Sequence, residues 1–152
     1  MRLISHRGNT EGKCLMENMP SLAEFAMYLG FEVELDFWYT KGNFYTGHDE
    51  PIYKVEEEWL LKYKDELWCH GKNVLALQRL HKLGLNTFAH MEDPFVVTTH
   101  GHVISHPYAN WKPDTIVMLP ERSKSKQGLK KAMGVCSDHI AYYREYYSGK
   151  NI

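Results

Sequence analysis

The sequence predicts an α/β fold built on parallel strands, and three observations favour it. Short apolar runs alternate with segments of helical periodicity along the chain. The 152 residues show no linker, internal repeat or low-complexity tract, which indicates one domain over 1–152. Hydrophobic residues make up 43% and charged residues 24%, as in ordinary globular proteins, so the chain is expected to bury a real core.

The first half of the chain starts this alternation. Residues 3–5 form a brief strand, and a helix over 21–29 begins at Ser21, whose hydroxyl can cap it. The helix ends at a glycine, which takes the left-handed conformation without strain. Residues 31–40 place apolar side chains on one face and acidic ones on the other, which is typical of a strand. Residues 44–46 return from a turn as a second strand.

The second half continues in the same way. Helices are expected over 55–67, 73–83, 123–132 and 140–147. Strands are expected over 67–70, 86–90, 115–119 and 134–137, with a hairpin over 95–105. Repeated strand–helix alternation predicts parallel strands with helices packed outside them.

Charge and hydropathy exclude several classes of function. Lys and Arg number 18 against 19 Asp and Glu, a net charge of −1 that argues against nucleic-acid binding and a polybasic membrane anchor. No apolar run approaches the roughly 20 residues of a membrane-spanning helix. The start of the chain turns polar at once and the three cysteines lie far apart, which predicts a cytoplasmic protein without a signal peptide.

Imidazole, carboxylate and basic side chains gather where the predicted strands end. In chain order they are His6 and Arg7, Glu34 and Asp36, His48 and Asp49, His70 and Lys72, His90 with Glu92 and Asp93, Glu121, and Asp138 with His139. The C-terminal ends of parallel strands share one face, where such folds place their active sites. These side chains are therefore expected to form one site.

This set suits phosphoryl transfer on a diester. Glu34 and Asp36, two residues apart on a strand, point to the same side and can hold one hard divalent cation such as Mg²⁺ or Ca²⁺. A solvated acidic stripe is the alternative, because Glu32 shares their face. Arg7 and Lys72 can neutralise the phosphate oxygens of a small-molecule phosphodiester substrate.

Two histidines can divide the acid and base roles. The ordinary pKa of imidazole, about 6.5, lets His6 and His48 accept and donate protons at neutral pH. Taken alone, each could equally be a structural histidine in a turn. His100, His102 and His106 are expected to be surface histidines rather than a zinc site.

At these residues the sequence resembles the glycerophosphodiester phosphodiesterase family, within the phosphatidylinositol phospholipase C-like phosphodiesterase superfamily. The motifs that carry the likeness follow one another in the family's order: His6-Arg7-Gly8, Glu17-Asn18, the strand from Gly30 to Asp36, Thr40-Lys41-Gly42 and Gly47-His48-Asp49. They cover residues 4–51, and the ordered set is far more specific than any one motif.

The resemblance implies a (β/α)₈ TIM-type barrel with its site at the C-terminal strand ends. It implies that His6 and His48 are the catalytic acid–base pair and that Glu34 and Asp36 bind the metal. It also implies that Arg7 contacts phosphate, and that the default substrate is a glycerophosphodiester.

Two departures qualify the likeness. The family's third strand carries Glu-x-Lys, whereas this chain reads His70-Gly71-Lys72. Lys72 fits a phosphate contact, but imidazole at His70 is a softer ligand that shifts the preference toward Mn²⁺ or Zn²⁺, or leaves the third position to water. The chain is also short for the family, which predicts a reduced barrel, or an incomplete one covered by a second copy in a homodimer.

The sequence is therefore consistent with three functions. The first is a metal-dependent phosphodiesterase. The second is a non-catalytic module that binds a phosphate ligand on the same scaffold. The third is a phosphotransferase or lyase that makes cyclic products through a neighbouring hydroxyl of the substrate.

Overall fold

The structure is a computed structural model, and it describes residues 1–107, 109, 111–123 and 125–149. The strands are β1 (Arg2–His6), β2 (Glu32–Thr40), β3 (Asn43–Thr46), β4 (Tyr53–Val55), β5 (Leu67–Gly71), β6 (Asn86–Phe88), β7 (Phe95–Val97), β8 (Val103–Ser105), β9 (Ile116–Met118) and β10 (Gly134–Ser137). The helices are α1 (Pro20–Tyr28), α2 (Glu57–Lys62), α3 (Val74–Lys82) and α4 (Ile140–Ser148), with 3₁₀ turns η1 (Pro120–Arg122) and η2 (Leu129–Lys131).

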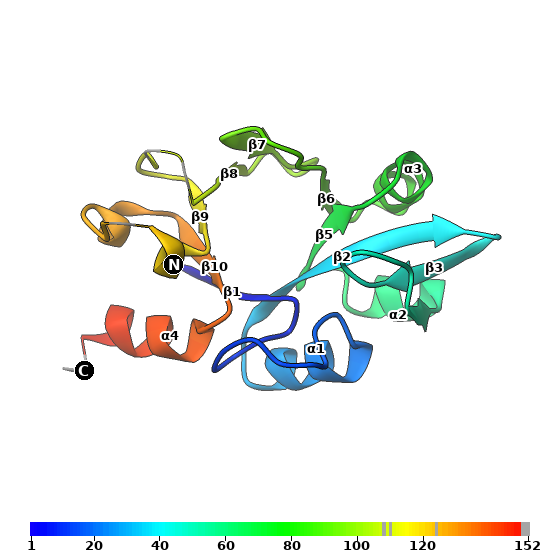
Figure 1. The fold of residues 1–152 in the computed structure, drawn as a ribbon, viewed down its shortest axis with the longest axis horizontal. Helices are drawn as coiled ribbons and strands as arrows, with labels where there is room; N and C mark the ends of the chain where they lie inside the picture. Colours follow the sequence, from blue (N-terminus) through cyan, green and yellow to red (C-terminus); the bar gives the residue numbers. More distant parts are fainter. Residues whose placement is uncertain (108, 110, 124, 150–152) are drawn as a thin grey trace.

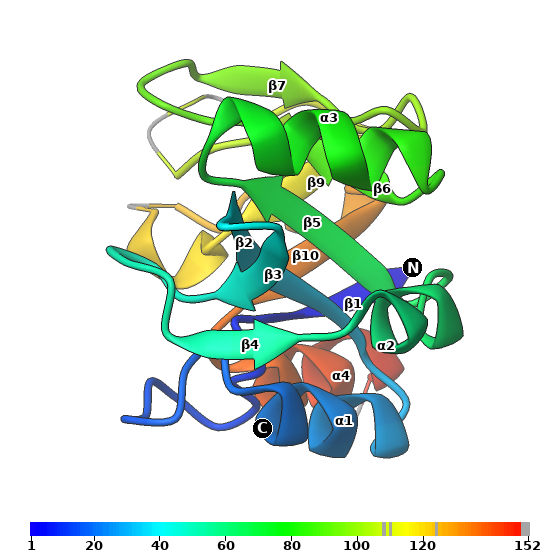
Figure 2. The same cartoon turned by 90° about the vertical axis from the view of Figure 1, so that its right-hand side faces the viewer.

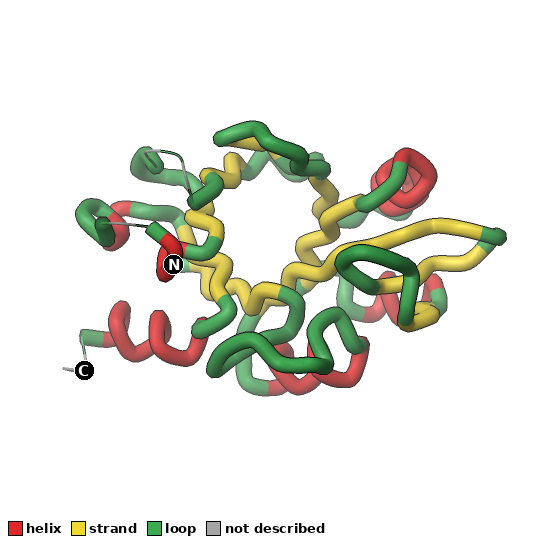
Figure 3. The backbone as a smooth tube through the Cα atoms, viewed as in Figure 1, coloured by secondary structure: helices red, strands yellow, loops and turns green. Residues whose placement is uncertain are grey.

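All of these strands belong to one curled, mixed sheet (Figures 1 and 3). β1 lies at its centre, parallel to β2 on one side and to β10 on the other. The parallel ladder continues from β2 to β5 and β6, and from β10 to β9 and β8. β3, β4 and β7 add antiparallel partners. The helices lie outside the curve of the sheet, and the β2–β3 hairpin extends away from it (Figure 1).

The predicted fold class, a reduced or incomplete (β/α)₈ TIM-type barrel, is wrong. The sheet is mixed and curls into a half-barrel rather than an alternating ring of strand–helix units. Within the described ranges, α-helices follow only β1, β4, β5 and β10. Two hydrogen bonds between Thr87 and Thr99 connect β6 to the segment after β7, in place of a strand ladder.

The missing helices have a cause in the sequence. Pro107 and Pro113 interrupt the connection from β8 to β9, and a proline inside a helix removes a hydrogen bond and clashes with the preceding turn. The helix predicted over 123–132 is also wrong, because Gly128 is left-handed there and the described residues of this region form only the 3₁₀ turn η2. Lys124, within that predicted helix, lies outside the described residues.

The outer face of the sheet packs against the helices. On β2, the alternate residues Val33, Leu35 and Phe37 are fully buried in one cluster with α1, α2 and α3 (Figure 2). A second cluster joins β1, β9 and β10 to α4 and η2. Because successive strand residues point to opposite faces, this packing directs Glu32, Glu34 and Asp36 to the inside of the curve.

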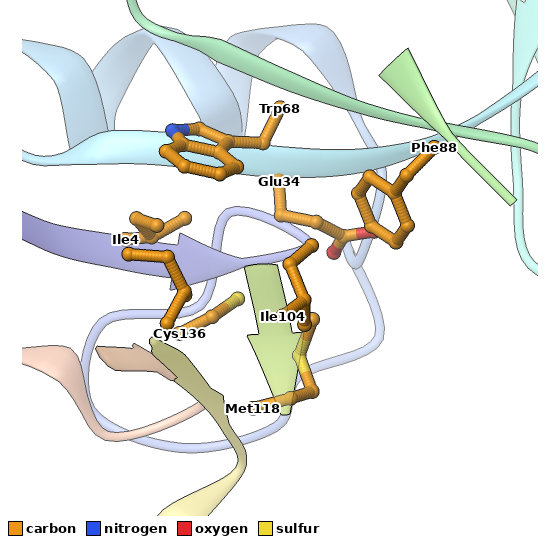
Figure 4. A pocket seen from close by; sticks show the side chains of 8 residues that line it. Ile4, Glu34, Trp68, Phe88, Ile104, Met118 and Cys136 are labelled. Carbon is orange, nitrogen blue, oxygen red and sulfur yellow. The ribbon is translucent and has the colours of Figure 1, made fainter. Parts of the chain in front are cut away.

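The inner face has a core of its own. Figure 4 shows Ile4, Trp68, Phe88, Ile104, Met118 and Cys136 around Glu34, and these side chains leave no space for a water molecule between them. Glu32, two residues before Glu34 on β2, accepts two hydrogen bonds from Arg2 and one from the indole of Trp68. These bonds pair the acidic side chain at the N-terminal end of the inner face. No described helix is long and apolar enough to cross a membrane.

Replacing Leu35 by alanine tests the packing that orients β2. Leu35 is fully buried, so Leu35→Ala should lower the free energy of unfolding by about 3 kcal/mol through lost transfer energy and a cavity. Leu15, which is fully exposed, is the matched control, and Leu15→Ala should change it by less than about 0.5 kcal/mol. Urea unfolding measures both, and equal effects would contradict the assignment of faces.

Candidate functional site

The C-terminal ends of four parallel strands bring titratable side chains together. His6 on β1, Asp36 on β2 and His70 on β5 each lie two residues beyond an inward-facing residue, so each points inward. Asp138 stands in the same position after β10. The strand register sets their heights, since His6 pairs with Glu34 and Asp36 pairs with His70.

Glu34, Asp36 and His70 form a compact set of metal ligands. Each offers one atom, and these atoms lie within 4.8 Å of one another. Nδ1 of His70 is 2.9 Å from Oδ1 of Asp36 and 3.9 Å from Oε1 of Glu34. Both carboxylates are almost fully buried, at 2% and 1% exposure. The predicted acidic pair and the predicted third ligand are therefore together, and the alternative of a solvated acidic stripe is wrong.

The donor set fits a divalent cation. Ligand atoms on opposite sides of one ion lie about 4 Å apart for Mg²⁺ and about 5 Å apart for Ca²⁺, which matches this spacing. Oδ1 of Asp36 is buried yet accepts no hydrogen bond from the described residues, despite the nearness of His70. Oδ1 of Asp36 and Nδ1 of His70 are therefore placed so that both can coordinate one cation.

Cationic groups surround Asp36. Nε of Arg7 lies 3.0 Å from Oδ2 of Asp36, and Nζ of Lys72 lies 3.8 Å from Oδ1. Burial by itself raises the pKa of Asp36, but the neighbouring His70 and Arg7 outweigh it and hold the pKa below its ordinary value. Glu34 shifts the other way, because burial and the charge of Asp36 raise its pKa. The ionised form of Glu34 is therefore unfavourable unless a proton or a cation lies beside it.

Asn18 fixes the position of Asp36. Its amide donates to Oδ2 of Asp36 at 3.0 Å, and its side-chain oxygen accepts from the Asp36 backbone at 2.9 Å. Its own backbone bonds to the carbonyl of Arg7 and the hydroxyl of Thr46. This residue is left-handed, with φ of 66°, a conformation that asparagine tolerates better than most side chains. In the sequence, Asn18 stood out only as part of the Glu17-Asn18 motif.

His6 forms an acid–base pair with Asp138. Nδ1 of His6 is 2.6 Å from Oδ1 of Asp138, and Asn9 donates to the same oxygen at 3.0 Å. An ionised carboxylate only accepts hydrogen bonds, so Nδ1 carries the proton and Nε2 is left for chemistry. That nitrogen lies 3.8 Å from Oε2 of Glu34, at the edge of the ligand set.

His48 lies at the rim rather than inside. Its side chain is 45% exposed, and its Nδ1 is 2.7 Å from Oδ1 of Asp49. Gly47, just before it, donates its backbone N–H to the carbonyl of Asp36 at 3.1 Å. This bond ties the backbone next to His48 to the end of β2. Among the described residues, no hydrogen bond or ion pair joins His48 to the ligand set. His6 and His48 are therefore each held by an aspartate but do not contact each other.

Asp138 is the residue that the sequence did not assign. It stood among the strand-end residues, but its role depends on the pairing of β1 with β10, two strands from opposite ends of the chain. Glu121 supports it by accepting from the Asp138 backbone at 3.0 Å and from the hydroxyl of Ser137 at 2.9 Å. The signal available was a carboxylate that directly follows the last apolar strand.

Three comparisons with known proteins identify no relative. No protein-family model, no curated protein and no solved structure matches this chain.

The ligand set predicts one divalent cation per chain. Asp36→Asn removes a charged ligand atom and should weaken the binding of Mn²⁺ and Mg²⁺ by about tenfold or more, as measured by titration calorimetry. Asp65→Asn, the same change at an exposed aspartate, should leave the affinity unchanged. Equal affinity in both variants would remove Asp36 from the site.

The His6–Asp138 contact predicts a pH-dependent contribution to stability. Burial raises the pKa of Asp138, but the hydrogen bond and charge of His6 outweigh it and lower the pKa to about 2. A folded pKa below the ordinary value stabilises the protein above about pH 4, and this is lost as the pH falls through about 2. Wild type should exceed Asp138→Asn by about 2 kcal/mol in unfolding free energy at pH 5, and the gap should close by pH 2. A constant gap across this range in urea unfolding would contradict the ionised pair.

Proposed function

We propose that this protein is a metal-dependent phosphodiesterase that acts on a glycerophosphodiester-like small molecule. The observation that carries the proposal is the meeting of a buried three-ligand cation site with an aspartate-held imidazole, His6, at its edge. A Lewis acid on the phosphate and a positioned base both promote diester cleavage, and a cation at this site together with His6 would supply them. The family resemblance of residues 4–51 points to the same chemistry.

The residues divide the reaction as follows. Nε2 of His6 takes the proton from the attacking water as its oxygen bonds to phosphorus, and Asp138 stabilises the imidazolium that results. Glu34, Asp36 and His70 would hold a divalent cation, which would supply positive charge for the phosphate oxygens. Lys72, half-buried beside Asp36, adds a second positive charge. Arg7 orients Asp36 and bridges it to Glu17.

His48 is the proposed acid for the leaving group. When the bond from phosphorus to the leaving oxygen breaks, that oxygen needs a proton, and His48 with Asp49 can give one from the rim. Its exposure fits a group that contacts substrate rather than other parts of the protein. The two imidazoles then reach a bound diester from different sides.

The metal we favour is Mg²⁺ or Mn²⁺. Two carboxylates suit hard cations, whereas the imidazole of His70 moves the preference toward Mn²⁺ or Zn²⁺. Mg²⁺ commonly binds through one or two carboxylates and keeps several waters, whereas Ca²⁺ takes six to eight oxygen ligands, so two carboxylates and an imidazole suit Mg²⁺ better. Cys69 and Cys136 are buried free thiols, which agrees with the proposed cytoplasmic setting.

One observation favours a non-catalytic phosphate-binding module instead. Arg7, the expected phosphate contact, is already paired with Asp36 and Glu17, and His48 is paired with Asp49 at the surface. Such a protein would bind a phosphodiester tightly without turning it over.

Turnover of a chromogenic phosphodiester with Mg²⁺, Mn²⁺, Ca²⁺ and Zn²⁺ in turn tests the proposal. His6→Ala and His48→Ala should each lower kcat by about 10²- to 10⁴-fold, the usual contribution of a positioned acid or base. His100→Ala, at an exposed histidine that contacts only the carbonyl of Gly84 among the hydrogen bonds described, should keep wild-type activity.

The outcomes separate the three functions. Metal-stimulated turnover that both variants lose supports the phosphodiesterase. Binding of a diester without turnover under any metal favours the binding module. Phosphorus NMR of the products distinguishes hydrolysis from cyclisation, because a cyclic phosphate would assign the attack to the substrate's own hydroxyl.

A further inference from the structure

Two histidines outside the ligand set, His90 and His106, stack on each other beyond the C-terminal ends of β6 and β8. His90 follows β6 and His106 follows β8, and their ring centres lie 3.2 Å apart with planes 15° from parallel. His106 shares the inward face of Ile104, which lines the inner core. The sequence placed His106 on the surface, and this is wrong, because it is only 7% exposed.

His106 has an unfilled hydrogen-bonding position. Its Nε2 is buried and has no partner among the described residues. Leaving a buried polar atom unpaired costs about 1–3 kcal/mol, so such a group at a site is a strong indication of a ligand. Nε2 of His90, by contrast, lies 2.9 Å from the carbonyl of Asp93, which fixes the ring and leaves its Nδ1 for a ligand.

Basic side chains lie on this side of the metal ligands, namely the ammonium of Lys72 and the stacked imidazoles of His90 and His106. Burial, followed by the charges of His70 and Lys72, lowers the pKa of His90, and burial with the charges of His90 and His70 lowers the pKa of His106 to about 4, so His106 is neutral near pH 7. The carboxylates Glu17 and Asp138 lie on the other side, beside Arg7 and His6. A ligand bound at the two histidines therefore finds hydrogen-bonding imidazoles and the ammonium of Lys72 on the same side of the metal ligands.

We propose that His90, His106 and Lys72 form a second phosphate site, which binds a phosphate monoester on the leaving-alcohol part of the substrate. The reference to a leaving alcohol rests on the proposed phosphodiesterase function, whereas phosphate binding by these residues does not. The substrate class is then a phosphodiester whose alcohol carries a further phosphate group.

A phosphate monoester fits these partners better than a sulfate or a carboxylate. Its oxygens can accept from the ammonium of Lys72 and from Nε2 of His106, which come from different strand ends. Its second pKa is about 6, so it can also share a proton with the bare Nδ1 of His90. A sulfate monoester has the same shape but no proton to share near neutral pH.

NMR of the histidine rings in the full chain tests this site without relying on activity. Phenyl phosphate, added to the Mg²⁺-loaded protein, should shift the ring signals of His90 and His106, and phenyl sulfate should do so about tenfold more weakly. His106→Phe keeps a flat ring against His90 but removes both nitrogens, and should weaken the phosphate effect on His90 about tenfold. His100→Phe, the same change at an exposed histidine, should not alter it. Unmoved ring signals, equal response to sulfate, or an unchanged affinity in His106→Phe would overturn the site.

A pair of substrates then tests the leaving-group assignment. Two diesters that differ only by a phosphate monoester on the leaving alcohol should differ about tenfold in kcat/KM, and His106→Phe or His90→Phe should bring the ratio toward one. A ratio near one in wild type overturns the assignment while the phosphodiesterase stands. If neither diester is cleaved, the phosphodiesterase proposal fails, and the ring titration alone decides the phosphate site.

Discussion

The burial of two neighbouring carboxylates is the constraint on which this structure depends. Glu34 and Asp36 lie on the inner face of a single strand, where isolated charges would be strongly unfavourable. Several segments at the C-terminal end contribute groups that offset this: Arg7 after β1, His70 on β5 with Lys72 just after it, and Asn18 from the loop before α1. The curl of the sheet brings these groups within reach, so fold and site require each other.

The same periodicity explains why the two ends of the sheet differ. Inward residues of β2 run from Glu32 through Glu34 to Asp36, three acids in a row. Glu32 forms an ion pair with Arg2 and accepts a hydrogen bond from the indole of Trp68. Apolar side chains such as Ile4 and Phe88 surround Glu34 and separate it from that end. The carboxylates of the candidate cation site therefore lie at the end where loops, and hence ligands, can reach them.

Local patterns predicted the site better than they predicted the fold. The alternation along residues 31–40 was enough to place Glu34 and Asp36 on one face, because a strand has a period of two. The barrel failed because strand closure depends on long-range pairing and on connections, and prolines remove the helices that a barrel needs after β6. The role of Asp138 could not be predicted for the same reason, because no local sequence pattern indicates that the first and last strands pair. The stacking of His90 on His106 also arises from separate strand ends.

His70 shows how one ligand can serve both stability and binding. A third carboxylate at this position would place three negative charges around one point, and each would raise the others' pKa values. An imidazole instead contacts Asp36 at 2.9 Å and stacks on Phe88 with ring centres 5.0 Å apart, so it is held from two directions. It also lowers the pKa of Asp36, which keeps that carboxylate ionised before any cation arrives. The contacts of His70 with both carboxylates therefore belong to the fold itself and do not depend on a bound cation.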